Sequence, residues 1–225
     1  MNEVVLDRAA RRRLARGGKT LAPITGIWSS NAAWAPTGYG TQTRQVVSRM
    51  AADGHNVAVA ANYGLEGTTT EWEGITHFPR GFDHYSNDVI GAYISDWSRQ
   101  FPSDREMLFT LYDVWVLKSA AFDHNRVVSW VPIDHSPVPP AVADFCAKDN
   151  VTPVAMSKFG SAQLDAKGIS NTYIPHAIDT AVMKPTPFIT NPHGASKTGR
   201  QLMGGVGDDR FVVGVVNANK GVSPN

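Results

Sequence analysis

Two stretches of the sequence place an acidic or imidazole side chain directly after an apolar run. Asp113 follows the run 108–112, and Asp134 and His135 follow the segment 131–133 (Val-Pro-Ile). A histidine beside a carboxylate can orient a hydroxyl group or transfer its proton, so we interpret these three residues as candidate catalytic groups. The alternatives are that the two aspartates cap helices and that the histidine is an ordinary surface residue.

A glycine-containing loop follows the first predicted strand, at 24–28. Gly38, Tyr39 and Gly40 lie in this loop, where the backbone can approach a ligand and the N–H groups of the next helix favour a phosphate or a polarised oxygen. The spacing is not the dinucleotide-binding Gly-x-Gly-x-x-Gly, because Thr43 takes the third glycine position, and it is not a P-loop. A tight turn explains the glycines equally well. We predict that Gly40→Val abolishes ligand binding and leaves the fold intact.

Further candidate binding residues lie in loops that follow predicted strands. They are Asn31, Trp34, Trp115, Ser157, His176 and Asp179. Aromatic rings can stack on a ligand, and the polar side chains can hydrogen-bond to it. The notable alternatives are buried packing for Trp115, helix capping for Ser157 and turn formation for Asp179.

Other chemical constellations are not supported. Asp83 with His84, and Asp123 with His124, are adjacent pairs without a third ligand at metal-binding spacing. No Gly-x-Ser-x-Gly nucleophile elbow is present. Cys146, the single cysteine, falls in a predicted helix and is interpreted as a small core residue. We therefore expect no metal and no other cofactor.

The apolar pattern of the chain predicts the scaffold that positions these residues. Short apolar runs alternate with segments of helical periodicity, without hairpin dipeptides between them, which is typical of parallel strands covered on both faces. The predicted strands are 24–28, 57–61, 72–79, 107–112, 127–131, 152–156 and 173–174, and the predicted helices are 41–52, 87–99, 114–121, 138–148 and 157–166. The predicted fold class is α/β, a doubly wound, Rossmann-like parallel sheet with its site at the carboxyl ends of the strands.

Composition and charge exclude several classes of protein. The 225 residues are 42% hydrophobic and 18% charged, and the net charge of +1 excludes a globally basic nucleic-acid binder. Apolar runs reach only about six residues, far below the roughly 20 of a transmembrane helix, and no signal-peptide pattern follows Met1. A single cysteine suits a reducing compartment, so we expect a cytoplasmic protein.

Three segments of different composition predict the domain organisation. Residues 1–20 carry six basic and two acidic residues, and we interpret them as a basic arm for an anionic partner or as a solvated leader. Residues 21–185 hold the alternating pattern of the main domain. Residues 186–225 begin with a linker rich in proline and glycine, include a short predicted helix at 196–203 and continue into an apolar strand at 211–216. This last segment predicts the opening of a second domain.

Three blocks, in order along the chain, resemble the family-four type of GT-B glycosyltransferases. The first joins 38–40 (Gly-Tyr-Gly) to 50–59 (Met-Ala-Ala-Asp-Gly-His-Asn-Val-Ala-Val). The second joins 157–160 (Ser-Lys-Phe-Gly) to 173–180 (Tyr-Ile-Pro-His-Ala-Ile-Asp-Thr) and 183–185 (Met-Lys-Pro). The third joins 200–204 (Arg-Gln-Leu-Met-Gly) to 211–214 (Phe-Val-Val-Gly).

The resemblance implies the N-terminal, acceptor-side domain of a GT-B enzyme, ending at the start of the donor-binding domain. Such an enzyme transfers a sugar from a nucleotide-sugar to an acceptor, here of unknown identity, without a metal. Gly38 and Gly40 would meet the donor diphosphate or the acceptor. His176 and Asp179 match the motif that leads to the interdomain hinge, and Lys220 would be the donor-binding lysine of the family's Lys-Gly pair.

The family's other donor residues, a basic pair and a Glu-x7-Glu element, have no counterpart in this chain. We therefore expect weak or no transfer by the 225 residues alone, and a second domain or chain that supplies the donor half. One alternative is a non-catalytic module that binds an acceptor or is completed by a partner. Another is an unrelated nucleotide-binding Rossmann protein, although the second strand ends in 60–62 (Ala-Ala-Asn) instead of a ribose-binding carboxylate.

Overall fold

The computed structural model describes residues 22–185, 189–190, 196–205, 207 and 209–213. The basic segment 1–20 and Lys220 lie outside the described residues, so what the sequence suggests for them stays a prediction. The chain divides into two compact units, Met1–Ala177 and Ile178–Asn225. This boundary falls before the predicted one at residue 185.

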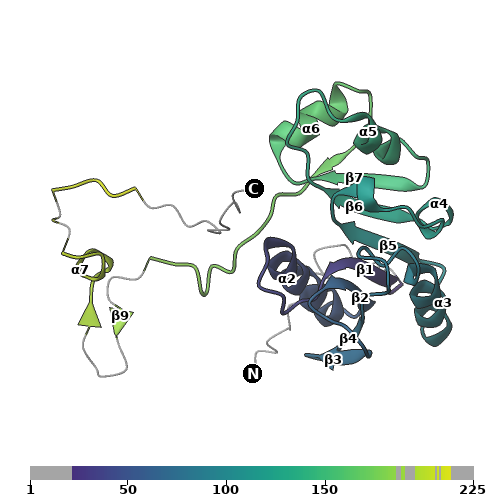
Figure 1. Cartoon of the computed structure of the whole chain (residues 1–225), viewed down its shortest axis with the longest axis horizontal. Coiled ribbons are helices and arrows are strands. Elements are labelled where there is room, and N and C mark those ends of the chain that lie inside the picture. The colour runs from purple at the N-terminus through teal and green to yellow at the C-terminus, as the bar shows by residue number, and fades with distance from the viewer. Residues whose placement is uncertain (1–21, 186–188, 191–195, 206, 208, 214–225) are drawn as a thin grey trace, which may run out of the picture. The chain divides into compact units, whose positions relative to one another are not determined.

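An eight-stranded sheet forms the first unit (Figure 1). The strands lie in the order β3-β4-β2-β1-β5-β6-β7-β8, and neighbours are parallel except for β3 and β4. Their bounds are β1 Thr25–Asn31, β2 Asn56–Tyr63, β3 Thr70–Trp72, β4 Ile75–Phe78, β5 Glu106–Leu111, β6 Val127–Val131, β7 Val151–Ala155 and β8 Thr172–Tyr173. The predicted α/β class with a mostly parallel sheet is confirmed, and the arrangement is compatible with a Rossmann-like fold.

The edge of the sheet differs from the prediction. A single strand was expected at 72–79, but the chain forms an antiparallel hairpin in which Trp72 pairs with Ile75. The two residues between them, Glu73 and Gly74, have φ angles of 49° and 75°. Positive φ at both central positions is the pattern of type I′ hairpin turns, and a glycine at the second position adopts it without strain.

Five α-helices and a short 3₁₀ helix connect the strands within the described part of the first unit. They are α2 Gly38–Ala52, α3 Ile90–Gln100, the 3₁₀ helix η1 Val114–Val116, α4 Ala121–His124, α5 Pro140–Cys146 and α6 Lys158–Asp165. The single helix expected at 114–121 is wrong, because η1 and α4 are separated by an irregular segment. The other helices agree with the periodicity to within a few residues at each end, as is usual for helix boundaries.

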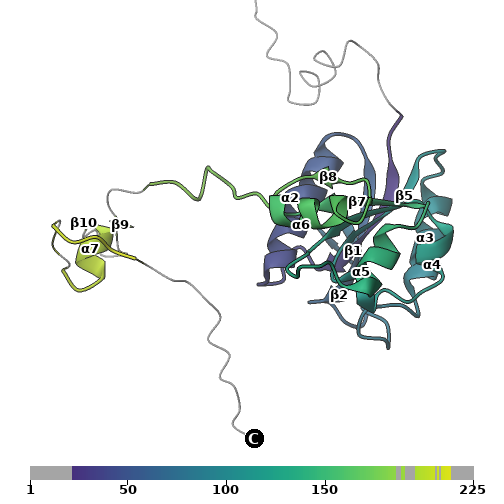
Figure 2. The ribbon, with the colours of Figure 1, turned by 90° about the horizontal axis from the view of Figure 1, so that it is seen from above.

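Alternate residues of the central strands pack into two hydrophobic clusters. In β1, Ile27 belongs to one cluster and Trp28 to the other, as the two-residue period of a strand requires. Val47 of α2 packs in the Trp28 cluster, whereas Trp97 of α3 packs in the Ile27 cluster. Figure 2 shows α2 on one side of the sheet and α3 and α4 on the other. Helices therefore cover both faces of the sheet.

The order of the strands creates a switch point between β1 and β5. From β1 the chain runs outward to β2 and β4, and it then returns through α3 to β5, on the opposite side of β1. The loops after β1 and β5 consequently leave the sheet in opposite directions. In open parallel sheets this divergence opens a crevice at the carboxyl ends of the two strands, where ligands bind.

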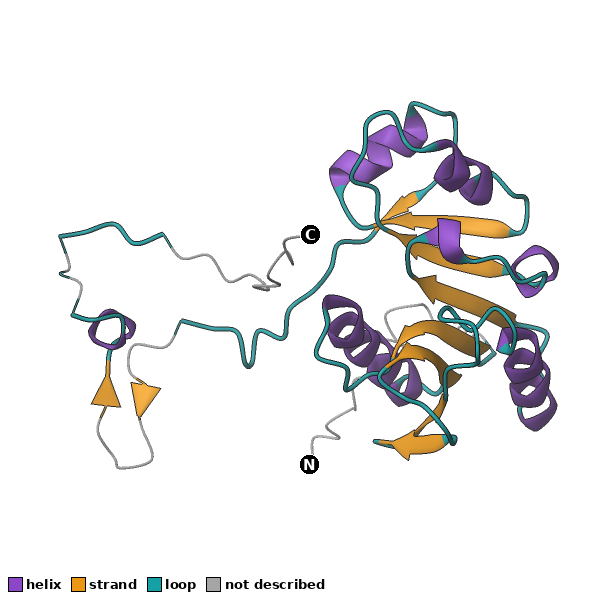
Figure 3. Cartoon of the chain, viewed as in Figure 1, coloured by secondary structure: helices purple, strands orange, loops and turns teal. Residues whose placement is uncertain are grey.

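The second unit contains little regular structure among its described residues (Figure 3). The strands β9 Ile189–Thr190 and β10 Ser196–Lys197 pair antiparallel, and the helix α7 Gly199–Leu202 follows them. The short helix expected at 196–203 is thus shorter than predicted. Residues 211–213 of the strand expected at 211–216 are described and are not in a strand, and the remaining three lie outside the described residues.

Candidate functional site

The candidate catalytic residues lie where the parallel strands end, at the carboxyl-end edge of the sheet. Asn31 is the last residue of β1, and Asp113 comes two residues after β5. Asp134 and His135 come after β6, the next strand along the sheet. Their position at this edge, on both sides of the switch point, agrees with the expectation from the sequence.

The first turn of α2 is attached to the end of β1 through Thr37. The Thr37 hydroxyl accepts a hydrogen bond from the backbone N–H of Gly40 at 2.9 Å, and it also accepts one from Asn31 Nδ2 at 2.8 Å. This N-cap starts the helix at Gly38, three residues earlier than the sequence suggested. Gly38, Tyr39 and Gly40 therefore form the first turn of α2 and do not belong to a loop before it.

The two glycines of this turn have different roles. A Cβ atom on Gly40 would lie 2.3 Å from the carbonyl oxygen of Ala35 and 2.9 Å from that of Ala32, so this glycine permits close backbone packing. A Cβ atom on Gly38 would meet nothing within 4 Å. The expectation that Gly40→Val leaves the fold intact is therefore wrong, since no rotamer moves a Cβ away from backbone atoms.

Tyr39 joins the start of α2 to the end of β5. Its hydroxyl is hydrogen-bonded to the Asp113 carboxylate, and its ring lies 5.6 Å from the ring of Tyr112. Burial, followed by the negative charge of Asp113, raises the pKa of Tyr39, so the phenol remains protonated at neutral pH. Asp113 does not cap η1 with its side chain. The capping alternative for this residue is therefore excluded.

Two carboxylates interact across the ends of β5 and β6. Burial raises the pKa of Asp113, the negative charge of Asp134 raises it further, and the hydrogen bond from Tyr39 acts in the opposite direction. A carboxyl group whose pKa is raised by burial and by a second carboxylate is frequently found in functional sites. Ion-pair networks produce similar pKa shifts. The sequence did not indicate that Tyr39 and Asp113 would be partners.

The imidazole of His135 is oriented by the residue before it. His135 Nδ1 lies 2.5 Å from Asp134 Oδ1, and both side chains are exposed. A proton on Nδ1 that is donated to the carboxylate leaves Nε2 as an acceptor directed elsewhere. Asp134 does not cap α5, whose N-cap position is Pro139 without a side-chain bond. The pair is thus arranged to accept or release a proton at Nε2.

The segment after β8 is fastened back to α2 by a buried amide. Gln42 donates from Nε2 to the Ala177 carbonyl at 2.9 Å, and its Oε1 accepts from the Ala177 N–H at 3.1 Å. Trp130 of β6 donates from Nε1 to the Ile174 carbonyl at 2.8 Å, and its ring meets that of His176 edge-on at 4.7 Å. Burial lowers the pKa of His176. Nothing in the local sequence identified Gln42 or Trp130 as anchors.

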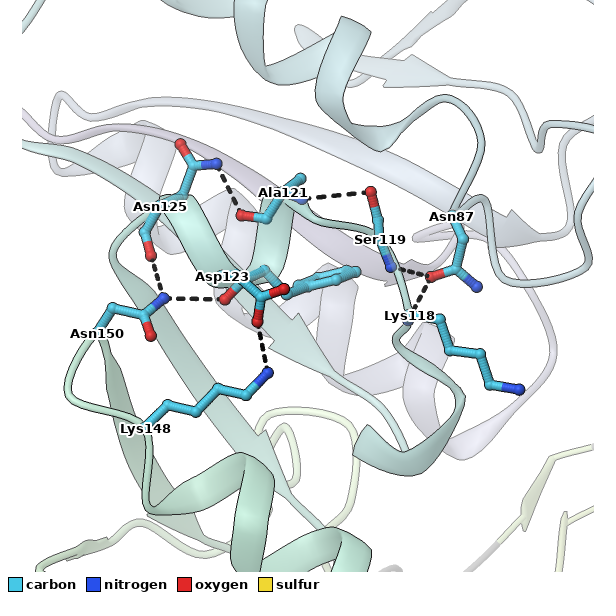
Figure 4. Close-up of polar contacts among 9 residues, drawn as sticks. Asn87, Lys118, Ser119, Ala121, Asp123, Asn125, Lys148 and Asn150 are labelled. Carbon is cyan, nitrogen blue, oxygen red and sulfur yellow. Dashed lines mark hydrogen bonds and ion pairs between the residues drawn. The ribbon is translucent and has the colours of Figure 1, made fainter.

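Side-chain amides hold the irregular connection after β5, which carries Asp113 and Trp115. Asn87, from the loop before α3, accepts the N–H groups of Lys118 and Ser119 at 2.7 Å and 3.1 Å (Figure 4). Farther along, Asn150 Nδ2 donates to the carbonyls of Phe122 and Asn125, and the bond to Asn125 is drawn in the same figure. These hydrogen bonds hold the connection in place where the sequence predicts a helix at 114–121.

The two candidate tryptophans differ in their surroundings. Trp34 is half-buried, its ring lies 4.6 Å from that of His77, and its Nε1 donates to the Gly64 carbonyl. It is therefore a packing residue on the β2–β4 side of the edge. Trp115 is 58% exposed beside the Asp113 loop. The packing alternative is wrong for Trp115, and its ring is available to a ligand.

Two of the remaining candidates have structural roles. The Ser157 hydroxyl accepts the N–H of Gly160 at 2.9 Å and caps α6, as the helix-capping alternative predicted. In the second unit, Asp179 Oδ1 accepts the N–H of Ala181 at 2.9 Å and shapes a turn. Ligand binding by either side chain stays a prediction.

No three His, Cys, Asp or Glu residues come together as metal ligands among the described residues. None of the helices that the structure describes is long and apolar enough to span a membrane. Comparisons with protein-family models, curated proteins and solved structures found no match to this chain. The site itself and the three sequence blocks therefore carry the functional proposal.

Proposed function

We propose that this chain is the acceptor-side half of a glycosyltransferase that uses a nucleotide-sugar donor. The observation that carries the proposal is the meeting of Tyr39 and Asp113 with Asp134 and His135 at the switch point of a parallel sheet. The resemblance to GT-B enzymes supports it, because its first two blocks contribute elements to this edge.

The chemistry of glycosyl transfer requires a group that accepts a proton. The acceptor oxygen forms a bond to the anomeric carbon of the donor sugar, the bond from that carbon to the diphosphate oxygen breaks, and the acceptor loses its hydroxyl proton. His135 Nε2 takes this proton, while the Asp134 carboxylate stabilises the imidazolium that forms. Asp113 and the exposed ring of Trp115 position the acceptor.

Calorimetric titration tests the proposal, with UDP-glucose, GDP-mannose, ADP-glucose and NAD each added to the 225-residue chain. We expect at least one nucleotide-sugar to bind weakly and NAD not to bind. Asn62 at the end of β2 cannot supply the carboxylate that usually holds the ribose of NAD. Tight binding of NAD without binding of any nucleotide-sugar would contradict the proposal.

The same titration distinguishes the proposed transferase half from the alternative, a non-catalytic module. If none of the four compounds binds and simple sugars do, the chain is an acceptor-binding module instead of a transferase half. Once a donor is found, release of its sugar can be followed in His135→Ala. His124→Ala is the matched control, because His124 is at the end of α4, away from the strand ends. A loss in the first variant alone supports the role of His135.

A further inference from the structure

Two buried amide oxygens near the switch point lack hydrogen-bond partners. Asn31 is 6% exposed and Asn62 is 2% exposed, and among the described residues neither Oδ1 atom accepts a hydrogen bond. Their nitrogen atoms do have partners, Thr37 Oγ1 at 2.8 Å and Ser29 Oγ at 3.4 Å. A buried acceptor without a donor costs free energy on the order of 1–3 kcal/mol, so a pair of them at a strand end indicates a binding partner.

A β-bulge places the two asparagines next to each other in the sheet. Ser30 of β1 pairs with Ala61, and Asn31 pairs with Tyr63, so Asn62 is the extra residue on β2. Bulges at the ends of strands redirect side chains and are common beside active sites. Here the bulge lies at the carboxyl end of β1, one of the two strands that border the switch point.

The other side of the switch point also presents hydrogen-bond acceptors. Asp113 and Asp134 interact at the ends of β5 and β6. Asp113 is hydrogen-bonded to Tyr39 in the first turn of α2. The start of a helix attracts negative charge, and the Asp113 carboxylate already supplies that charge here. A phosphate near these groups would be repelled by the two carboxylates and would receive no hydrogen bond from the two amide oxygens.

We propose that the carboxyl-end edge of the sheet, with Asn31, Asn62, Asp113 and Asp134, selects an acceptor rich in hydrogen-bond donors and free of anionic groups, namely a neutral sugar or an amino sugar. The inference rests on the proposed function and adds the chemical class of the acceptor to it. Hydroxyl and ammonium groups would supply the donors that the amide oxygens lack, and an ammonium group would also be attracted to the carboxylates.

Three matched probes test the inference in NMR titrations of the chain, namely glucose, glucosamine and glucose 6-phosphate. We expect glucosamine to bind at least as tightly as glucose, and glucose 6-phosphate to bind about tenfold more weakly than glucose. Binding of the phosphate that equals or exceeds that of glucose would overturn the inference, as would binding of none of the probes. A transferase with a phosphorylated acceptor would still bind a nucleotide-sugar, so this failure is distinct from failure of the proposed function.

Variants of the asparagines test their part in the selection. Asn31→Ala is expected to lower the affinity for glucose about fivefold, whereas Asn31→Asp retains the acceptor oxygen and is expected to retain binding. Asn62→Ala provides the same test if the first variant fails to fold, because within the described part of the chain the Asn62 side chain makes a single long hydrogen bond, to Ser29. Glucose affinity that is unchanged in both folded alanine variants would overturn the inference.

A double variant tests the part of the carboxylates. Asp113→Asn combined with Asp134→Asn is expected to remove the preference for glucosamine over glucose and to bring glucose 6-phosphate to within about twofold of glucose. Asp96→Asn, on the exposed side of α3, is the control and is expected to leave all three affinities unchanged. An unaltered ranking in the double variant would contradict the selection by charge.

Discussion

At the scale of single residues, the site depends on a carboxylate that the fold holds at a cost. Asp113 is partly buried near Asp134, and both effects raise its pKa. Tyr39 compensates in part through its hydrogen bond. Residues that lower the stability of a fold are expected where function requires them, and Asp113 after β5 is such a residue.

Replacing this carboxylate with an amide therefore tests the assignment. In Asp113→Asn the amide oxygen still accepts from Tyr39 but carries no charge. Because the folded-state pKa of Asp113 lies above its ordinary value of 3.8, stability is lost as pH rises through this titration, and the variant avoids that loss. We expect a melting temperature about 1–2 °C above wild type at pH 7, with the difference disappearing below pH of about 3. A lower melting temperature at pH 7 would contradict the account.

The hydrogen bond from Tyr39 has its own expected effect. Tyr39→Phe removes the donor that lowers the pKa of Asp113, so the carboxylate should titrate at a higher pH than in wild type. Carboxyl-detected NMR of Asp113 measures this directly. Tyr63→Phe is the matched control, because Tyr63 is 56% exposed at the end of β2. An equal titration midpoint for Asp113 in Tyr39→Phe and in wild type would show that Tyr39 does not donate to this carboxylate.

The sequence identified some of these residues and not others, for a physical reason. Asp113, Asp134 and His135 were found because parallel strands bring the residues that follow them to one edge. The bond between Tyr39 and Asp113 joins side chains more than 70 residues apart, and the orphan oxygen of Asn31 depends on which groups the fold brings around it. No local pattern encodes such proximity.

At the scale of elements, α2 begins three residues before the helix that the apolar pattern predicts. Thr37 is a good N-cap, and its bond to Gly40 adds a turn that the apolar periodicity, which begins at Val46, does not reveal. The sequence does not predict the antiparallel β3–β4 pair either, because Glu73-Gly74 is not one of the usual hairpin dipeptides. In both cases a cap or a turn residue outweighed the hydrophobic pattern.

The two glycines of α2 offer a matched pair of variants. Gly40→Ala forces a Cβ atom against the Ala35 and Ala32 carbonyls and is expected to lower the free energy of unfolding by about 2–3 kcal/mol. Gly38→Ala enters open space and is expected to change it by no more than about 0.5 kcal/mol. Urea unfolding of the two proteins measures the contrast. Equal losses would show that the packing around Gly40 is misassigned.

The attachment of the segment after β8 can be tested through Gln42. Gln42→Ala leaves the N–H and carbonyl of Ala177 without their partners, and we expect a loss of about 1–3 kcal/mol together with faster amide exchange at Ala177. Gln100→Ala, which removes an exposed amide on α3, is expected to cost less than about 0.5 kcal/mol. Unchanged exchange at Ala177 would mean that Gln42 does not hold this segment.

At the scale of the whole molecule, the proposed site depends on the strand order around β1 and β5. The sequence predicted α/β alternation well, because buried parallel strands are apolar throughout and the helices between them are periodic. It could not give the strand order, which arises from the return of the chain through α3 to the other side of β1. That return brings the ends of β1, β5 and β6 together as one site.

Mapping of the amides that respond to a sugar tests this claim most directly. We expect glucose or glucosamine, added to saturation, to shift the NMR signals of Asn31, Tyr39, Asp113 and His135. Signals at the amino ends of the strands, such as those of Thr25 and Glu106 where β1 and β5 begin, should remain unchanged. Shifts concentrated at these amino ends, or no shifts at the carboxyl ends of the strands, would contradict the account.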